Sequence, residues 1–143
     1  MGMDDFFEAW RPRLLSVFRI VLGLLFIEHG TSKLLHFPEV AMFDNLRLFS
    51  LIGVTGVLEL VGGVLLLLGL FSRATAFILS GEMAFAYFMV HAPQGFFPVL
   101  NRGEAAVFYC FAFLYLAVAG GGAWSLDNAW RRRAAPDPGQ TTR

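Results

Sequence analysis

The sequence predicts an all-α integral membrane protein, a four-helix bundle with both termini in the cytoplasm. Of its 143 residues 57% are hydrophobic, and its mean hydropathy is +0.62. A soluble domain of this size cannot bury so much apolar surface. The apolar residues gather in four stretches, each close to the roughly 20 residues that a helix needs to cross a bilayer. These stretches are 14–35, 52–70, 74–90 and 105–120.

The first apolar stretch, 14–35, is predicted to be a transmembrane helix and not a signal peptide. Arg11 and Arg13 precede it, as basic residues precede a signal sequence. No A-x-A-like cleavage site follows, however, and Glu28 and Lys33 lie where cleavage would be expected. Aromatic and acidic residues are mixed in residues 1–13, which we expect to lie at the cytoplasmic interface.

The second and third stretches are separated by Phe71–Arg73 alone, so they are predicted to form a tight helical hairpin. The fourth follows Glu104, whose carboxylate suits the positive dipole at the start of a helix. The long connection after the first stretch carries apolar residues at spacings of three, which predict a short amphipathic helix on the outer surface. These residues are Val40, Phe43, Leu46 and Phe49. The segment Ser125-x-Asp127 is predicted to be a cap or turn.

The distribution of lysine and arginine predicts the orientation, because basic loops stay preferentially in the cytoplasm. The two termini and the short middle turn carry seven of these residues, against three in the other two connections. The seven are Arg11, Arg13, Arg73, Arg131, Arg132, Arg133 and Arg143. Residues 14–127 then form a transmembrane domain, and the basic residues 128–143 a disordered cytoplasmic tail. We expect a multi-pass protein of the cell membrane, which in bacteria is the inner membrane.

Composition and cysteine content exclude two functional classes. The formal net charge is zero, whereas a nucleic-acid-binding protein needs a basic face. A single cysteine, Cys110, cannot form an intrachain disulfide or a dithiol redox pair. In the apolar middle of the fourth stretch it is expected to serve in packing.

Acidic residues lie inside three of the four stretches, where a charged group costs about 2.5–3.5 kcal/mol to insert. Glu28, Glu59 and Glu82 are all expected within roughly 5 Å of the bilayer midplane. Arg19 lies about 9 Å nearer the cytoplasm, and its long side chain is expected to reach Glu82 or Glu59. Glu28 lies opposite Arg19 on an ideal helix. It therefore meets a different neighbour, faces a second protomer, or lies where the helix is distorted.

This layer and its surroundings supply the candidate site residues. Catalytic or proton-transferring roles are assigned to Glu59, Glu82, Arg19 and His29. Ligand binding is assigned to Glu28, Lys33, Phe85, His91, Glu104, Phe108, Phe111 and Tyr115, whose aromatic members would wall a pocket. The alternative is an internal salt-bridge network that only holds the helices in register. No metal site is expected, because no Glu-x-x-His pair repeats across the helices as in di-iron bundles.

A set of short motifs runs in order from Arg19 to Asp127. The set comprises Arg19 with Gly23, His29-Gly30, Lys33-Leu34, Gly56-x-x-Glu59-x-x-Gly62-Gly63, Leu68-Gly69-Leu70, Arg73, Met83, Ala86, His91, Gly95-Phe96, Gly103-Glu104 and Gly120-x-Gly122-x-x-Ser125-Leu126-Asp127. This ordered set resembles the DoxX family of small four-helix membrane proteins.

The resemblance implies a four-helix bundle and a connection to membrane redox chemistry. The family takes its name from a membrane subunit of a thiosulfate:quinone oxidoreductase. This chain lacks a haem-type histidine pair at matched depth, a thiol pair and a nucleotide-binding fingerprint, so no intrinsic cofactor is expected. Redox work would need a bound quinone, a partner redox subunit, or both.

Three functions stay open at this stage. The first is a membrane subunit or accessory protein of quinone-linked redox chemistry, in which the carboxylate and arginine layer binds the headgroup or relays protons. The second is a proton-coupled carrier or sensor of a small hydrophobic solute. The third is a scaffold for partner redox proteins. The small residues on the helix faces also allow a homo-oligomer in the lipid bilayer.

Overall fold

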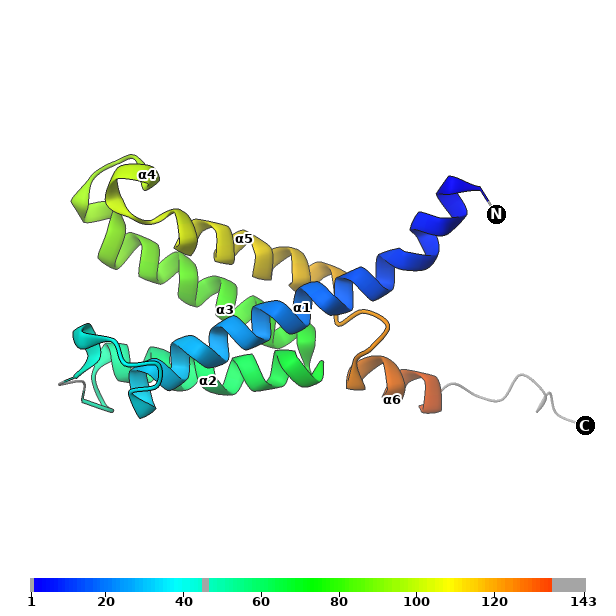
Figure 1. Ribbon diagram of the computed structural model, residues 1–143, viewed down its shortest axis with the longest axis horizontal. Helices are drawn as coiled ribbons and strands as arrows, with labels where there is room; N and C mark the ends of the chain where they lie inside the picture. Colours follow the sequence, from blue (N-terminus) through cyan, green and yellow to red (C-terminus); the bar gives the residue numbers. More distant parts are fainter. Residues whose placement is uncertain (1, 45–46, 135–143) are drawn as a thin grey trace, which may run out of the picture.

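A computed structural model describes residues 2–44 and 47–134. All regular secondary structure in this part of the chain is helical, and it contains no strands. Four longer helices run along the long axis of the molecule (Figure 1). They are α1 (Met3–Leu35), α2 (Leu51–Leu68), α3 (Ser72–Ala86) and α5 (Glu104–Ala119). Shorter elements are η1 (Ala41–Phe43), η2 (Tyr87–His91), η3 (Ala92–Gln94), α4 (Pro98–Asn101) and α6 (Leu126–Ala134).

Three helical segments are long and apolar enough to cross a membrane, which agrees with the predicted all-helical membrane fold. They are Met3–Leu35, Leu51–Leu68 and Ser72–Gln94, the last formed by α3 with its continuation through η2 and η3. The fourth predicted span corresponds to α5, which is apolar but has 16 residues. At 1.5 Å per residue α5 is about 24 Å long, a little less than the roughly 30 Å hydrocarbon core.

The first helix extends beyond the predicted span 14–35 toward the N-terminus. Residues 1–13 were expected at the cytoplasmic interface, and α1 is continuous from Met3 through Pro12 to Leu35. Proline lacks the amide hydrogen that would bond one turn back, so a helix bends at such a position. The first turns of α1 accordingly leave the axis of the rest of the helix (Figure 1).

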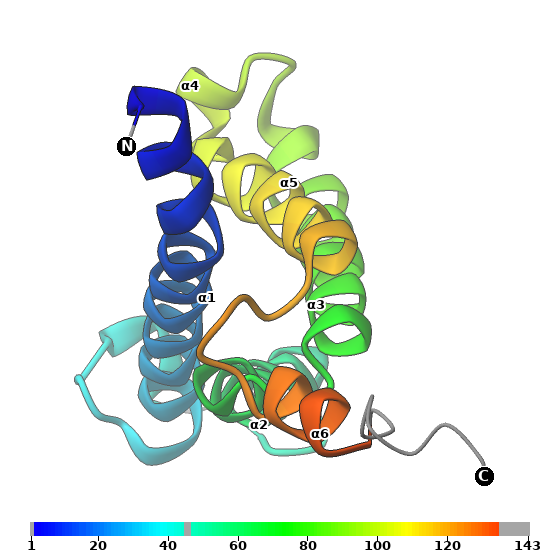
Figure 2. The same cartoon turned by 90° about the vertical axis from the view of Figure 1, so that its right-hand side faces the viewer.

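The helices associate as two pairs, α1 with α2 and α3 with α5 (Figure 2). Glycines bring the backbones of the first pair together. A Cβ atom added to Gly30 would lie 2.5 Å from the backbone nitrogen of Leu60, and one added to Gly63 would lie 2.7 Å from that of Ile27. Only glycine permits so close an approach between helices. Gly23 and Gly30 therefore lie on the face of α1 that contacts α2.

Substituting Gly30 tests this close contact. We expect Gly30→Ala to lower the free energy of unfolding by about 1–3 kcal/mol, because the methyl group must push α2 away. Gly81→Ala is the matched control, since nothing lies within 4 Å of its added Cβ. It should be neutral or stabilising by up to about 1 kcal/mol. Equal stabilities of the two variants, measured by reversible unfolding in mixed micelles, would contradict the contact.

The two pairs meet at a packed core. Phe26 of α1, Leu66 of α2, Leu79 of α3 and Phe113 of α5 are each at most 1% exposed. Within the second pair, Ser80 Oγ donates to the backbone oxygen of Cys110 at 2.8 Å. Cys110 is half-buried in this contact, as expected for a packing residue.

The chain after α5 folds back across the end of the molecule that carries the termini. The amide of Ala123 donates to the backbone oxygen of Pro12, and the carboxylate of Asp127 accepts from the amides of Phe71 and Ser72 at 2.8 Å each. Asp127 therefore caps the start of α3, in agreement with the predicted capping role. This end of the molecule, which we call the terminal end, is closed by hydrogen bonds.

Two expectations about connecting segments differ from the structure. Residues 128–134 were expected to be disordered but belong to α6, whose first turn is capped by Ser125 Oγ accepting from the amide of Asn128 at 3.2 Å. Residues 135–143 lie outside the described part. The predicted amphipathic helix between α1 and α2 is a single turn, Ala41–Phe43, and Leu46 also lies outside the described part.

Candidate functional site

A buried ion pair joins α1 to α2 near the end opposite the termini, which we call the outer end. Nζ of Lys33 lies 2.7 Å from Oε2 of Glu59 and donates to its Oε1 at 2.8 Å. It also donates to Oγ1 of Thr55 at 3.2 Å. Glu59 is 3% exposed. Removing two charges from water costs several kcal/mol for each ion, so each depends on the other for compensation.

Glu82 of α3 is the third charged residue of this region. It is 8% exposed and lies within electrostatic range of Glu59 and Lys33. Among the described residues, neither oxygen of its carboxyl group has a hydrogen-bond partner. A buried carboxyl group without a partner is unfavourable in apolar surroundings, where a polar ligand can restore the missing interactions. Glu82 is thus the group of the predicted layer that is least satisfied by the protein itself.

A pocket of about 380 Å³ opens beside the ion pair, and we call it the acidic pocket. Small-molecule sites have volumes of about 300–1,000 Å³. All four longer helices contribute to its wall, together with η1 and η2. Its polar lining consists of His29, Lys33, Thr55, Glu59, His91 and Tyr109, and the rest is aromatic, methionine and aliphatic side chains. A few polar groups in an apolar wall are typical of a site for a small, largely hydrophobic molecule.

Aromatic rings connect α1 with α5 across this pocket. The ring of Phe26 meets Tyr109 edge to face at 5.1 Å and Phe113 at 4.5 Å. The ring centroid of His29 lies 6.2 Å from that of Tyr109, so this predicted site residue is part of the aromatic wall. His91, at the outer end, has its Nδ1 3.0 Å from the backbone oxygen of Asn101. That contact fixes the orientation of the His91 ring at the rim of the pocket.

Arg19 does not join the acidic residues, although the sequence analysis expected it to reach Glu82 or Glu59. It is fully buried near the terminal end, and its guanidinium group donates only to backbone oxygens. The acceptors are Leu66, Leu67 at 2.8 Å, Gly121 at 2.8 Å and Trp124 at 2.7 Å. The guanidinium therefore caps the carboxyl end of α2 and holds the segment that follows α5. The structure gives it a stabilising position, remote from the pocket.

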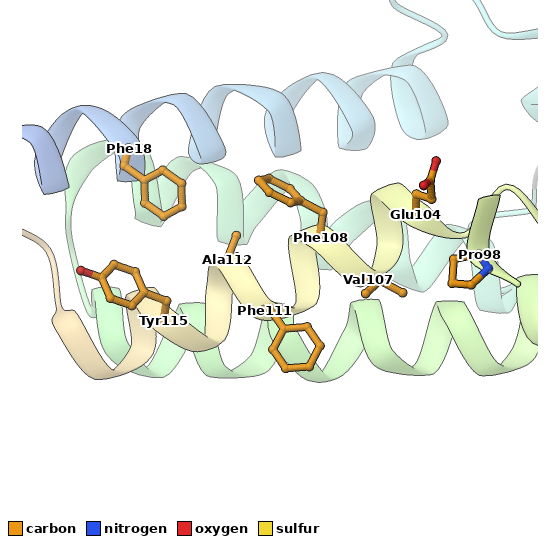
Figure 3. A pocket seen from close by; sticks show the side chains of 8 residues that line it. All are labelled: Phe18, Pro98, Glu104, Val107, Phe108, Phe111, Ala112 and Tyr115. Carbon is orange, nitrogen blue, oxygen red and sulfur yellow. The ribbon is translucent and has the colours of Figure 1, made fainter.

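Three predicted ligand residues of α5 lie outside the pocket. Phe108, Phe111 and Tyr115 line a shallow groove of about 630 Å³ on the outer face of this helix (Figure 3). Each is at least 60% exposed, which places these rings toward the surrounding lipid. Glu104, in the first turn of α5, lines the same groove. Among the predicted aromatic residues, Phe85 is the one that lines the acidic pocket, and it is 46% exposed.

Glu28 is exposed on α1 and does not line the acidic pocket. Glu82 does not line this pocket either, but it lies within electrostatic range of Glu59 and Lys33. The described residues contain no group of three or more His, Cys, Asp or Glu that could hold a metal ion.

Sequence reasoning missed Tyr109 and Thr55 as site residues. Thr55 could have been found, because it lies one helical turn before Glu59 and so shares its face. Tyr109 carries no comparable signal, because the aromatic residues of α5 are distributed around the whole helix and mark no single face. The position of Tyr109 in the pocket depends on its packing against Phe26 and Phe113.

Comparison with known proteins identifies a family and two relatives of this chain. A profile of the DoxX family matches residues 14–92, more than half of the chain. An uncharacterized protein of Haemophilus influenzae is 47% identical over 130 residues, which are 88% of this chain and 97% of the relative. An uncharacterized membrane protein of Mycobacterium tuberculosis is 25% identical over 142 residues, 89% of this chain and 87% of that protein. No solved structure matches the chain.

Proposed function

Because the chain belongs to the DoxX family of membrane proteins, we propose that it serves quinone-linked redox chemistry as a membrane subunit or accessory protein. In this proposal α5 is a fourth membrane span, and the basic terminal end faces the cytoplasm. The acidic pocket then lies in the outer half of the bilayer and receives a quinone-like headgroup. One observation carries the proposal: a buried Lys33–Glu59 ion pair forms part of the wall of an otherwise apolar pocket.

The residues of the pocket suit a flat, weakly polar ring. Phe26 and Tyr109 offer ring faces and edges, and the methionines Met83 and Met89 adapt to an irregular ligand surface. Lys33 presents a cation and Tyr109 a hydroxyl group, both of which can donate to carbonyl oxygens. The unsatisfied oxygens of nearby Glu82 can accept from a hydroxyl group. The site thus offers both donors and acceptors.

Each polar group has a definable part in this proposal. A bound quinone supplies the ring that takes up and releases electrons. Glu82 and Glu59 hold or pass protons beside that ring, because quinone reduction consumes protons as well as electrons. Lys33 offsets the negative charge of Glu59 and orients the headgroup. His91 and Tyr109, at the wall and rim of the pocket, are placed to pass protons toward the outer surface.

Glu82→Gln tests the proposed role of the acidic pocket. The amide keeps the shape of the side chain but is a weaker acceptor than a carboxylate and cannot take up a proton. We therefore expect binding of benzoquinol, the reduced form that bears hydroxyl groups, to weaken at least about tenfold in lipid nanodiscs. Glu59→Gln should have a similar effect in the folded fraction. Glu28→Gln is the matched control, because it makes the same chemical change at an exposed position, and it should bind as the native chain does. Unchanged binding by folded Glu82→Gln would argue against the proposal.

A proton-coupled carrier of a small hydrophobic solute is the second candidate, and the unpartnered carboxyl group of Glu82 favours it. The two candidates differ in what they move. A carrier transfers the solute across a liposome membrane together with protons, whereas a quinone-linked protein binds quinone without transferring it. Measuring solute and proton flux in proteoliposomes separates them.

A further inference from the structure

The acidic pocket continues into a second surface feature along α1 and α5. A shallow groove of about 380 Å³ runs over the contact between these helices, and it shares Ala105 and Tyr109 with the acidic pocket. It shares Phe18, Glu104 and Phe108 with the groove on the outer face of α5. We call the two connected grooves the seam groove. The acidic pocket and the seam groove are therefore neighbours, with Ala105 and Tyr109 at their common boundary.

The packing of the core blocks a path along the axis of the molecule. Leu66, Phe113 and Leu116 are fully buried between the acidic pocket and the terminal end. At that end Arg19 and Asp127 hold the connecting segments by hydrogen bonds. A long apolar chain attached to a headgroup in the pocket has no room in this direction.

The contacts within the α1–α2 and α3–α5 pairs are closed more tightly than the contact between α1 and α5. Added Cβ atoms at Gly23 and Gly63 would lie 2.8 and 2.7 Å from backbone atoms of the partner helix in the α1–α2 pair. In the α3–α5 pair, Ser80 bonds to the backbone of Cys110. In contrast, α1 and α5 meet through aromatic side chains, such as Phe18 with Tyr115 at 6.4 Å. Side chains can separate around a ligand more easily than backbones in direct contact.

The walls of the seam groove are apolar over most of its length. Val21, Leu22 and Leu25 come from α1, and Phe108, Ala112 and Tyr115 come from α5. In the close view Phe18 points from α1 toward α5, and Phe108 lies on the side of α5 that faces α1 (Figure 3). The single ionisable acid in this lining, Glu104, lies at the outer end of the groove. Such a largely apolar lining fits a hydrocarbon chain, and besides Glu104 its polar side-chain groups are the hydroxyls of Tyr109 and Tyr115.

We propose that the seam groove binds the isoprenoid or alkyl tail of the ligand whose headgroup occupies the acidic pocket. This inference rests on the proposed function, and it adds that the ligand is a long-tailed amphiphile that enters sideways from the bilayer between α1 and α5. Headgroup and tail would meet at Ala105 and Tyr109, because these two residues line both the acidic pocket and the seam groove. The small side chain of Ala105 and a rotation of the Tyr109 ring would let the ligand pass between them.

Narrowing the seam groove tests the inference. Dissociation constants are measured in nanodiscs for a tail-free benzoquinone and for the same ring bearing a decyl chain. With Val21→Trp, which narrows the groove at a position that does not line the acidic pocket, we expect the decyl compound to bind about tenfold more weakly and the tail-free ring to stay within about twofold of the native chain. Comparing the same compound between variants cancels the effect of its partition into lipid. Val118→Trp, at a 72% exposed position outside the groove, is the control and should change neither dissociation constant.

A second variant covers the case in which Val21→Trp disturbs the fold. Leu25→Trp narrows the seam groove from the α1 side at a position that does not line the acidic pocket, and it should weaken binding of the decyl compound alone. If the folded variants bind both compounds as the native chain does, the groove holds only bulk lipid and the inference is wrong. Equal weakening of both compounds by Leu25→Trp also overturns it. If the native chain binds neither compound, the proposed function itself fails.

Discussion

Replacing Lys33 with methionine is expected to destabilise the protein strongly, by about 3–5 kcal/mol. The substitution leaves the carboxylate of Glu59 buried at 3% exposure without the cation that lies 2.7 Å away. Breaking one side of a buried pair costs far more than the pair itself contributes, because the remaining charge is uncompensated. The free energy of unfolding, measured by reversible denaturation in mixed micelles, checks this expectation.

The double variant Lys33→Met with Glu59→Leu separates stability from function. Replacing both charges by apolar groups of similar size is often neutral or stabilising, so the double variant should recover to within about 1 kcal/mol of the native chain. If the pair serves only to hold α1 against α2, this variant should bind quinone as the native chain does. If the pair serves the pocket, the variant should be folded yet fail to bind quinone.

Replacing Arg19 with methionine is the second change for which we expect a large effect. The guanidinium donates to four backbone oxygens, and hydrogen bonds from charged groups contribute about 1.5–3 kcal/mol each. We therefore expect the free energy of unfolding to fall by at least about 3 kcal/mol. The loss should be greatest at the terminal end, where hydrogen exchange of the amides of Trp124 and Asp127 should accelerate.

Arg19→Lys provides the control for this second prediction. A lysine keeps the charge but cannot reach acceptors on two sides at once as the planar guanidinium does. It should recover only part of the lost stability. The folded fraction of both variants should bind quinone with native affinity, because Arg19 lies remote from the acidic pocket. Loss of binding in a folded Arg19→Lys variant would place Arg19 back in the functional site, as the sequence analysis expected.

The sequence predicted the helices well because their signals are local. Continuous apolar stretches predicted the all-helical membrane character, and three of them correspond to helical segments long and apolar enough to cross a membrane among the described residues. The capping role of Asp127 was also readable, because Ser, Asp and Asn next to a glycine-rich segment favour caps and turns. The family was recognisable from the ordered motifs, and the profile match confirms it.

The sequence could not predict the partners of Arg19. Its acceptors are backbone oxygens, which every residue possesses, so no side chain in the sequence marks them. Two of them belong to the segment Gly121–Trp124, whose return to the end of α1 follows from backbone conformation and not from apolar periodicity. An argument based on ionisable side chains alone therefore directed Arg19 to the wrong neighbours.

The pairing of Lys33 with Glu59 was missed for a different reason. Lys33 was assigned to ligand binding, whereas Arg19 was the cation expected to reach Glu82 or Glu59. A lysine side chain extends along apolar surface for several ångströms, and Lys33 reaches the carboxylate of Glu59 in this way. The chemistry of the layer was thus foreseen, but the identity of its cation was not.

The central claim is that the Lys33–Glu59 pair serves a ligand site. Its most direct test is quinone binding by the double variant Lys33→Met with Glu59→Leu, in nanodiscs, beside the native chain and after both are shown to be equally stable. The account predicts saturable binding by the native chain and none by the double variant. Equal binding by the two proteins, or none by the native chain, would contradict it.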